Sequence, residues 1–264
     1  MYLKKSLIIL LIFTIVYNFM EARISSGENF KSEQYIKVTA HRGSSIKARD
    51  NSIEAINLAI AEEADYIEID ARRTKDDKIV LSHDDNYVYA NGSSKSIARN
   101  TLSSLNRNNK GFLFGKVEKI ATLESALKII KGKAKINIDM KINNDEDILP
   151  KIIVSLVEKN NMENDVIITS SNYTSILTVK KLNPSIKIGY ITNTLPENID
   201  INEIDALSIE YQGLSKEVVE KVHRYKKEVF VWTINNEIDA EKAINLGVDN
   251  IITNDVKMVK SIIK

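Results

Sequence analysis

The sequence predicts an α/β fold, in particular a TIM-type (β/α)8 barrel that occupies residues 35–264. Along this part of the chain, short β-branched runs alternate with segments of helical periodicity, which indicates βαβ units and a parallel sheet. Eight or so units in a segment of this length favour a closed barrel over a doubly wound sheet. The first expected strand leads into His41-Arg42-Gly43. This is not a glycine-rich phosphate loop, which argues against a dinucleotide-binding fold.

The expected strands are short and rich in isoleucine and valine, residues that favour β structure. We expect them at residues 36–40, 66–70, 79–82, 135–140, 166–169, 186–191, 206–209, 229–233 and 250–252. The expected helices lie at residues 52–63, 123–131, 145–160, 173–182, 216–225 and 237–246. Asn51, with Glu54 three residues later, is a candidate N-cap of the first helix, and Thr122 of the second. Gly247 stands where a helix C-cap is expected.

One connection is too short for the barrel pattern. The residues Thr74-Lys75-Asp76-Asp77 join a strand that reaches Arg73 to the next run at 79–83, whereas a parallel crossover needs a dozen residues or more. We therefore expect an antiparallel β-hairpin beside the barrel. Residues 84–121 show no clear strand–helix unit and are expected to form an inserted segment at one end of the barrel.

The N-terminus is distinct from the barrel domain. Lys4 and Lys5 precede an apolar run that is short for a membrane span and typical of a signal peptide. We expect residues 1–23 to form one hydrophobic helix, either a cleaved signal peptide or a membrane anchor, with a linker at 24–34. Both alternatives place the barrel outside the cytoplasm. A buried first helix of the domain is the third alternative.

The composition limits the possible partners. The chain has 264 residues, a formal net charge of +1 and no cysteine. A balanced charge gives no global attraction to nucleic acid, so we expect no nucleic-acid partner and only local recognition of phosphate. The lack of cysteine excludes disulfides and zinc–thiolate sites.

Two of the three histidines stand at the carboxyl ends of expected strands. His41 closes the first strand, and His83 closes the second strand of the hairpin. Polar residues at these strand ends line the active sites of (β/α)8 barrels, so both imidazoles are candidate catalytic groups. Taken alone, a histidine at a strand end is more often a surface residue. We expect His223, in a helical stretch, on the surface.

Three acidic residues complete the candidate site. Glu68 and Asp70 alternate on one strand, so both project to the same face, where burial and mutual repulsion require a compensating charge. The strand at 135–140 adds Asp139. Three carboxylates with open positions suit a divalent cation, Mg²⁺ or Ca²⁺. With a two-residue hairpin turn, His83 would lie opposite Glu68 or Asp70, beside the acidic pair.

Two basic residues and one aromatic residue adjoin these groups. Arg42 follows His41, and Lys141 follows the strand that carries Asp139. A guanidinium fork and an ammonium group are suitable contacts for a phosphodiester. Trp232, the only tryptophan, ends a strand, where either core packing or the wall of an alcohol pocket would explain it.

The order of these motifs resembles the glycerophosphodiester phosphodiesterase family over about residues 37–258. That family has an HRG strand end, a PENT-like helix entry, an acidic strand, a TKDG turn, an HD pair, a second acidic strand ending in lysine, and VWTxN and GxDxxxT segments. The matching segments here are HRG at 41–43, RDNS at 49–52, IEID at 67–70, TKDD at 74–77, HD at 83–84, NIDMK at 137–141, VWTIN at 231–235 and GVDNIIT at 247–253. Three positions depart from the pattern: Asp50 and Asp139 replace glutamates, and Asp77 replaces the turn glycine.

The resemblance implies metal-dependent hydrolysis of glycerophosphodiesters to sn-glycerol 3-phosphate and an alcohol. Carried over by position, Glu68, Asp70 and Asp139 are the metal ligands, and His41 and His83 are the general acid and base. The first attack can come from the glycerol hydroxyl or from water, and the sequence does not separate these routes. We expect no obligate protein partner.

Two other functions are compatible with the same residues. One is a phospholipase D-like barrel enzyme that acts on lysophospholipid or sphingomyelin, which an N-terminal anchor would favour. The other is a non-catalytic barrel that binds phosphodiesters, for which the shortened acid at Asp139 is the argument.

Overall fold

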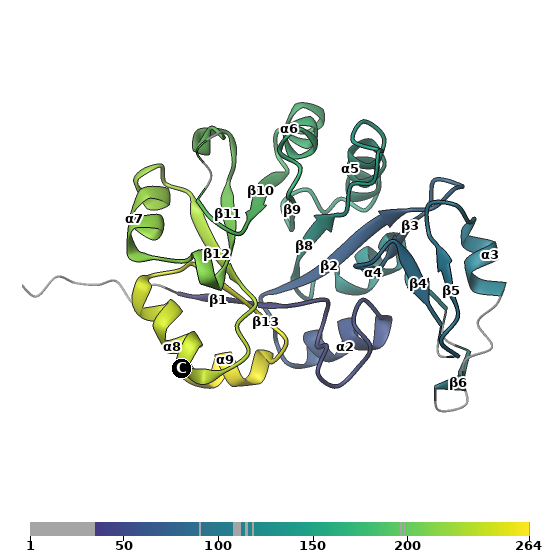
Figure 1. The fold of residues 1–264 in the computed structure, drawn as a ribbon, viewed down its shortest axis with the longest axis horizontal. Helices are drawn as coiled ribbons and strands as arrows, with labels where there is room; N and C mark the ends of the chain where they lie inside the picture. Colours follow the sequence, from purple (N-terminus) through teal and green to yellow (C-terminus); the bar gives the residue numbers. More distant parts are fainter. Residues whose placement is uncertain are drawn as a thin grey trace, which may run out of the picture. The chain divides into compact units, whose positions relative to one another are not determined.

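Eight parallel strands of the computed structural model close into a barrel, as predicted (Figure 1). They are β1 (Lys37–Ala40), β2 (Tyr66–Arg73), β8 (Lys135–Met140), β9 (Val166–Ser170), β10 (Lys187–Thr192), β11 (Ala206–Glu210), β12 (Glu228–Trp232) and β13 (Asn250–Thr253). The sheet runs from β2 through β8 and onward in chain order to β13. β1 then pairs with both β13 and β2, which closes the ring.

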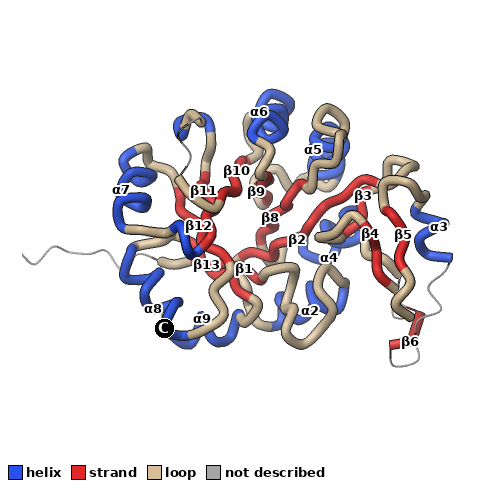
Figure 2. The backbone as a smooth tube through the Cα atoms, viewed as in Figure 1, coloured by secondary structure: helices blue, strands red, loops and turns tan. Residues whose placement is uncertain are grey.

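The helices lie around the outside of the strands (Figure 2). Those of the barrel are α2 (Ile53–Ala61), α4 (Leu123–Ile130), α5 (Leu149–Lys159), α6 (Tyr173–Leu182), α7 (Lys216–Arg224), α8 (Glu237–Leu246) and α9 (Val256–Ile262). Between β10 and β11, the described residues contain a 3₁₀ turn at Ile201–Glu203 in place of an α-helix. A second 3₁₀ turn, Tyr211–Gly213, precedes α7. Thr122 and Gly247 cap α4 and α8, which confirms both predictions.

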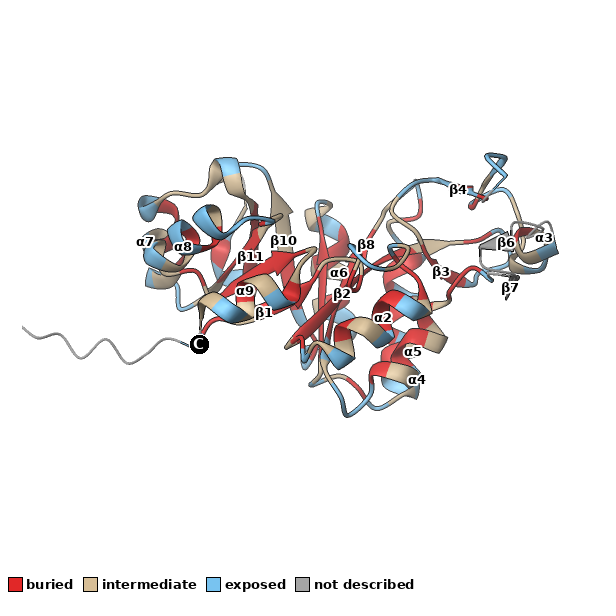
Figure 3. Ribbon diagram, turned by 90° about the horizontal axis from the view of Figure 1, so that it is seen from below, coloured by how far each residue is buried: buried red, intermediate tan, exposed pale blue. Residues whose placement is uncertain are grey.

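The core has two layers, and the strands are the most buried elements (Figure 3). Outward-facing isoleucines and valines of the strands pack against the helices. A smaller cluster fills the inside of the barrel: Tyr66, Ile167, Ala206, Phe230 and Ile252, with Trp232 against it. Fully burying a valine, isoleucine or phenylalanine side chain contributes about 1.5–3 kcal/mol. The barrel is therefore a packed scaffold that fixes the residues at its ends.

The predicted hairpin is present, but its predicted register is wrong. β3 (Ile79–Leu81) pairs antiparallel with β2, with Arg73 opposite Ile79. Residues 74–78 therefore form a wider turn. The Thr74 hydroxyl stabilises it by accepting from the Lys78 N–H at 3.0 Å and donating to Asp76. Asp77 adopts φ +57 there, the conformation that favours glycine.

The wider turn shifts His83 by one position relative to the acids. Ser82 N donates to the carbonyl of Asp70 at 3.0 Å, so Ser82 stands beside Asp70. His83 follows beyond the end of β3 and lies opposite neither Glu68 nor Asp70.

The inserted segment has its own small core. It contains β4 (Asn86–Val88) paired with β5 (Ser94–Ser96), the helix α3 (Leu102–Arg107), and β6 (Phe112–Leu113) paired with β7 (Lys116–Val117). Its buried apolar residues pack together with Val80 of β3: Tyr87, Tyr89, Ile97, Leu105 and Ile120. In Figure 1 the segment lies beyond β2 and β3, at one side of the barrel.

The structure describes residues 35–89, 91–107, 112–113, 116–117, 119–195, 197 and 199–263. The predicted signal or anchor at 1–23 and the predicted linker at 24–34 lie outside these residues. Among the described residues, no helix has the length and apolar character that would let it cross a membrane.

Candidate active site

A cavity of about 120 Å³ opens where the barrel strands end. It collects eight of the nine residues that the sequence singled out: His41, Arg42, Glu68, Asp70, His83, Asp139, Lys141 and Trp232. Asp50 does not line this cavity, although its carboxylate lies 3.4 Å from Nη1 of Arg42. Residues from β1, β2, β8, β12 and the hairpin thus meet at one end of the barrel, where (β/α)8 enzymes carry their active sites.

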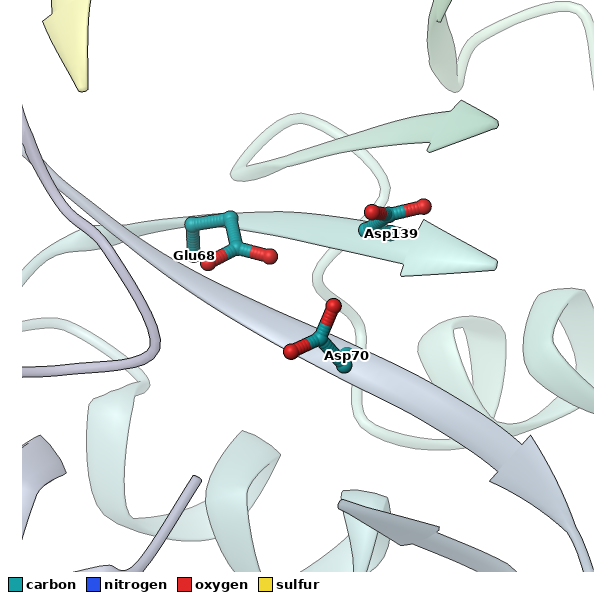
Figure 4. Close-up of side chains that lie close together, drawn as sticks. All are labelled: Glu68, Asp70 and Asp139. Atoms are coloured by element: carbon teal, nitrogen blue, oxygen red, sulfur yellow. The ribbon is translucent and has the colours of Figure 1, made fainter. Parts of the chain in front are cut away.

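Three buried carboxylates line the cavity, and Figure 4 shows them close together on β2 and β8. Asp70 on β2 stands directly beside Asp139 on β8 in the parallel register, and Glu68 lies two residues earlier on β2. One ligand atom from each of Glu68, Asp70 and Asp139 can be chosen so that all three lie within 4.8 Å of one another. Oxygen donors that converge in this way suit a hard divalent cation.

The electrostatics of the cluster show the cost of this arrangement. Burial raises the pKa of Glu68 well above its usual value, and the neighbouring Asp70 and Asp139 raise it further. Burial also raises the pKa of Asp139. For Asp70, burial acts in the same direction, but the charges of Lys141 and Arg42 outweigh it and the pKa is lowered. A bound divalent cation would offset both the burial and the mutual repulsion of these acids and would favour their charged forms.

Lys141 lies among the carboxylates. Its Nζ is 3.1 Å from Asp70 Oδ1 and also contacts Asp139. Burial lowers the pKa of Lys141, but the two aspartates more than compensate and the pKa is raised, so the ammonium stays charged. Lys141 therefore balances the acids in this structure, and its predicted phosphate contact stays a prediction.

The HRG segment connects the first strand to the acids. The backbone N–H of Arg42 donates to Glu68 at 2.7 Å, and its Nε lies 3.3 Å from Asp70. Gly43 has φ +81, and a Cβ there would lie 2.7 Å from atoms of Ala55 in α2. Any larger residue would push the loop away from α2, and with it Arg42 from the acids.

Asn51 is not the N-cap of the first helix. Ser52 caps α2 by accepting from the N–H of Ala55. Asn51 has φ +57 and turns its side chain to Asp70: Nδ2 donates to the carboxylate at 2.7 Å, and Oδ1 accepts from the Asp70 N–H at 2.9 Å. This pair of bonds fixes the orientation of a predicted metal ligand, a role that the cap interpretation missed.

His41 is held by residues from the far end of the chain. Its Nδ1 lies 2.7 Å from Oδ1 of Asn254, which also accepts from Ser45, while Asn235 accepts from the backbone of Asn254. Because an amide oxygen only accepts, Nδ1 carries the proton and Nε2 of the neutral ring is an acceptor. Burial and the charge of Arg42 lower the pKa of His41, which favours the neutral ring.

His83 has a different environment. Its side chain is 43% exposed, and its Nδ1 lies 2.8 Å from the Asp84 carboxylate, an ion pair when the ring is protonated. The Arg72 guanidinium holds the main chain, because Nε and Nη2 donate to the His83 carbonyl at 2.8 and 2.6 Å. Nδ1 of His41 thus has a neutral amide as its partner, whereas Nδ1 of His83 has a carboxylate.

Comparison with known proteins identifies the family. The model of the glycerophosphoryl diester phosphodiesterase family matches residues 41–258, which is most of the chain. The chain belongs to this family. The glycerophosphodiester phosphodiesterase of Caldanaerobacter subterraneus subsp. tengcongensis is 29% identical over 238 residues, which cover 86% of this chain and 97% of that protein.

Solved structures have the same fold. An Oleispira antarctica phosphodiesterase, determined in complex with the product sn-glycerol-3-phosphate, superposes with a TM-score of 0.78 at 24% identity and covers 85% of this chain and 95% of that chain. A glycerophosphodiester phosphodiesterase from Parabacteroides distasonis gives a TM-score of 0.76 at 24% identity, covering 86% and 96%. As a member of the glycerophosphoryl diester phosphodiesterase family, the chain is a phosphoric diester hydrolase.

The family motif explains only part of this site. The departures at Asp50 and Asp139 keep the carboxylate, and Asp139 still reaches the acidic cluster although its side chain is one methylene shorter than glutamate. Asn51, Arg72 and Asn254, which orient the predicted site residues, were not singled out for these roles from the sequence.

Proposed function

We propose that the enzyme hydrolyses glycerophosphodiesters to sn-glycerol 3-phosphate and an alcohol, in a reaction that requires a divalent cation and uses His41 and His83 as base and acid. The observation that carries this proposal is the meeting of three buried carboxylates and two imidazoles in one cavity. The product complex of the Oleispira antarctica phosphodiesterase supports the same products here.

Glu68, Asp70 and Asp139 would hold the cation. The residues fit such an ion, because all three donors are carboxylate oxygens, all are buried, and burial raises the pKa values of Glu68 and Asp139, a cost that a bound cation would offset. Oxygen-only donors favour Mg²⁺ or Ca²⁺. When bound, the ion would supply positive charge to the phosphodiester oxygens. Arg42 and Lys141 would add a guanidinium fork and an ammonium from the protein.

We assign the base to His41 and the acid to His83. The Asn254 contact leaves Nε2 of neutral His41 free to take a proton, and the lowered pKa keeps that form populated near neutrality. His83 in its imidazolium form pairs with Asp84 through Nδ1 and can donate from Nε2. The attacking oxygen gives its proton to His41 as it bonds to phosphorus. The bond from phosphorus to the leaving oxygen breaks, and that oxygen takes the proton of His83.

Two attacking groups fit this scheme. Direct attack by water gives the products in one step. Attack by the neighbouring glycerol hydroxyl gives a cyclic phosphate, which water then opens while the two histidines exchange roles. Trapping a cyclic phosphate during turnover would distinguish the two routes.

The decisive experiment measures glycerol 3-phosphate released from a panel of glycerophosphodiesters, with and without a chelator. We expect release with Mg²⁺ or Ca²⁺, loss with chelator, and recovery when the cation is restored. Release that chelator leaves unchanged would contradict the cation requirement. No release from any member of the panel would contradict the proposed substrate class.

A lysophospholipid substrate is the second candidate. A lysophospholipase D from Homo sapiens is 21% identical and covers 83% of this chain and 82% of that protein. The apolar segment predicted at 1–23 would hold such an enzyme at a membrane, with the barrel outside the cytoplasm. Comparing turnover of glycerophosphocholine with that of lysophosphatidylcholine separates the two substrates, and fractionation of cells that express the full chain tests the location.

A further inference from the structure

The short segment that carries His83 lies outside the strands. β3 ends at Leu81 and β4 begins at Asn86, so residues 82–85 connect the hairpin to the inserted segment. The His83 side chain is 43% exposed, and Asp84, which it contacts, is 78% exposed. Because neither side chain is packed in place, the position of the imidazole depends on how the main chain of residues 82–85 is held.

One arginine binds this segment at two points. Arg72 stands on the part of β2 that pairs with β3, opposite Val80. Its Nε and Nη2 both donate to the His83 carbonyl oxygen, at 2.8 and 2.6 Å, and its Nη1 pairs with the Asp85 carboxylate. The rigid fork of a guanidinium can make these three contacts together, whereas a lysine ammonium is a single point charge on a flexible stem.

Arg72 lies behind the catalytic cavity. His83 lines that cavity, and Arg72 does not. The ends of the segment have contacts of their own, because Ser82 N donates to the Asp70 carbonyl at 3.0 Å and the Asp85 carbonyl accepts from Ile97 N at 2.9 Å. Arg72 supplies the contact at His83 itself, so it can affect the reaction through the segment that it holds.

The adjacent Arg73 provides a comparison. Successive side chains of a strand point to opposite faces, and Arg73 pairs with Asp145 at 3.1 Å and with Asp77 at 2.8 Å. These contacts fix the hairpin turn to the loop that follows β8. Both partners lie outside residues 82–85, which makes Arg73 a matched control for Arg72.

We propose that Arg72 is the positioning residue of the general acid: it fixes the main chain of His83 so that the imidazole can protonate the leaving alcohol. The inference rests on the proposed function, which assigns the acid to His83. In that step the bond from phosphorus to the leaving oxygen breaks, its electron pair passes to the oxygen, and the oxygen takes the Nε2 proton of His83. Arg72 keeps its own protons. Its loss misplaces the imidazole, and a misplacement of about 1 Å can cost about 10²-fold in rate.

The leaving group distinguishes a misplaced acid from a general loss of structure. An alkoxide needs a proton as it leaves, whereas 4-nitrophenolate leaves without one. We expect Arg72→Met to lower kcat/KM for glycerophosphoethanolamine by about 10²-fold, with a much smaller loss for the 4-nitrophenyl ester of glycerol phosphate, when release of the alcohol is measured. Arg72→Lys keeps the charge but not the fork, so its loss should be smaller and equally selective. It carries the test if Arg72→Met does not fold.

Two further variants calibrate the comparison. Arg73→Met should lower thermal stability and leave the ratio of the two substrates unchanged. His83→Ala removes the acid itself and should show the same selective loss as Arg72→Met. If His83→Ala is selective but the Arg72 variants lower both substrates equally, lower neither, or match Arg73→Met, the positioning role of Arg72 is overturned. Equal losses on both substrates in His83→Ala would instead contradict the acid role of His83 in the proposed function, and the inference would fall with it.

Discussion

The two ends of the barrel use acidic side chains in opposite ways. At the amino end, three aspartates each precede a strand and accept from a backbone N–H of the neighbouring parallel strand: Asp65 from Val38, Asp205 from Ile188 and Asp249 from Val229. Each also has a basic partner, respectively Lys260 at 3.8 Å, Lys180 at 3.0 Å and His223 at 2.8 Å. At this end each acid has its own backbone donor and its own basic partner, so each stabilises the junction of two strands.

At the carboxyl end the acids share their surroundings. Glu68, Asp70 and Asp139 lie within one site, and Arg42 and Lys141 both direct their charge to Asp70. Burial raises the pKa values of Glu68 and Asp139, and the neighbouring acids raise them further. Acidic side chains therefore stabilise the fold at the amino end, whereas at the carboxyl end their burial close together costs free energy. Sites that keep such charges together are candidates for function.

The largest expected effect tests whether the carboxyl end serves catalysis. We expect His41→Ala and His83→Ala each to lower turnover by about 10²–10⁴-fold, the usual contribution of a general acid or base. Because neither side chain supports the barrel core, thermal unfolding should stay close to wild type. Unchanged turnover in either variant, measured as glycerol 3-phosphate release, would remove that histidine from the mechanism.

Much of the fold could be predicted from the sequence. The strands could be predicted because β-branched runs mark each of them. That the predicted site residues line one cavity could be predicted because residues at the carboxyl ends of the strands lie at the barrel rim. The strand 135–140 and the helices 173–182 and 237–246 agree with the structure to the residue. The helix α9 was missed, although Asp255 is a suitable N-cap signal for it.

Orienting residues were harder to predict because their roles depend on backbone conformation and distant contacts. Asn51 reaches Asp70 only because its φ is +57. Asn254 meets His41 although they are 213 positions apart in the chain. The hairpin register depended on side-chain bonds of Thr74 within the turn. No periodicity in the sequence records such contacts.

The next effect concerns the support of the acidic cluster. Asn51→Ala removes both hydrogen bonds to Asp70 and should weaken binding of the divalent cation by about 10–100-fold, as is usual when the residue that orients a ligand is lost. Titration of Mg²⁺ or Ca²⁺, followed by calorimetry, measures the change without relying on activity. Ser52→Ala, which removes the adjacent helix cap, is the control and should affect stability while leaving cation affinity in place.

A smaller effect is expected at the amino end. Asp205→Ala leaves the buried N–H of Ile188 without its acceptor and removes the partner of Lys180, which should lower the free energy of unfolding by about 1–2 kcal/mol. Turnover of the folded enzyme should be unchanged. Asp205→Asn keeps an oxygen acceptor for Ile188 and should retain most of the stability. If Asp205→Ala lowered kcat without lowering stability, the division of roles between the two ends would be wrong.

The smallest expected effect comes from giving His41 the kind of partner that His223 has. At the amino end, His223 already pairs with a carboxylate, whereas the partner of His41 is the neutral amide of Asn254. Asn254→Asp would install such a pair at the catalytic end. A carboxylate favours the protonated ring, so the pKa of His41 should rise.

The sign of the pH effect follows from the role of His41 as base. Burial lowers its pKa from the usual value of 6.5, so the neutral, active form of wild type persists below that pH. Asn254→Asp should move the acidic limb of the kcat/KM profile to higher pH. Asn254→Leu removes a hydrogen bond that raises the pKa, so it should move the limb to lower pH. Opposite displacements from one position would show that the neutral partner sets the working range of the base, and displacements of the same sign would refute it.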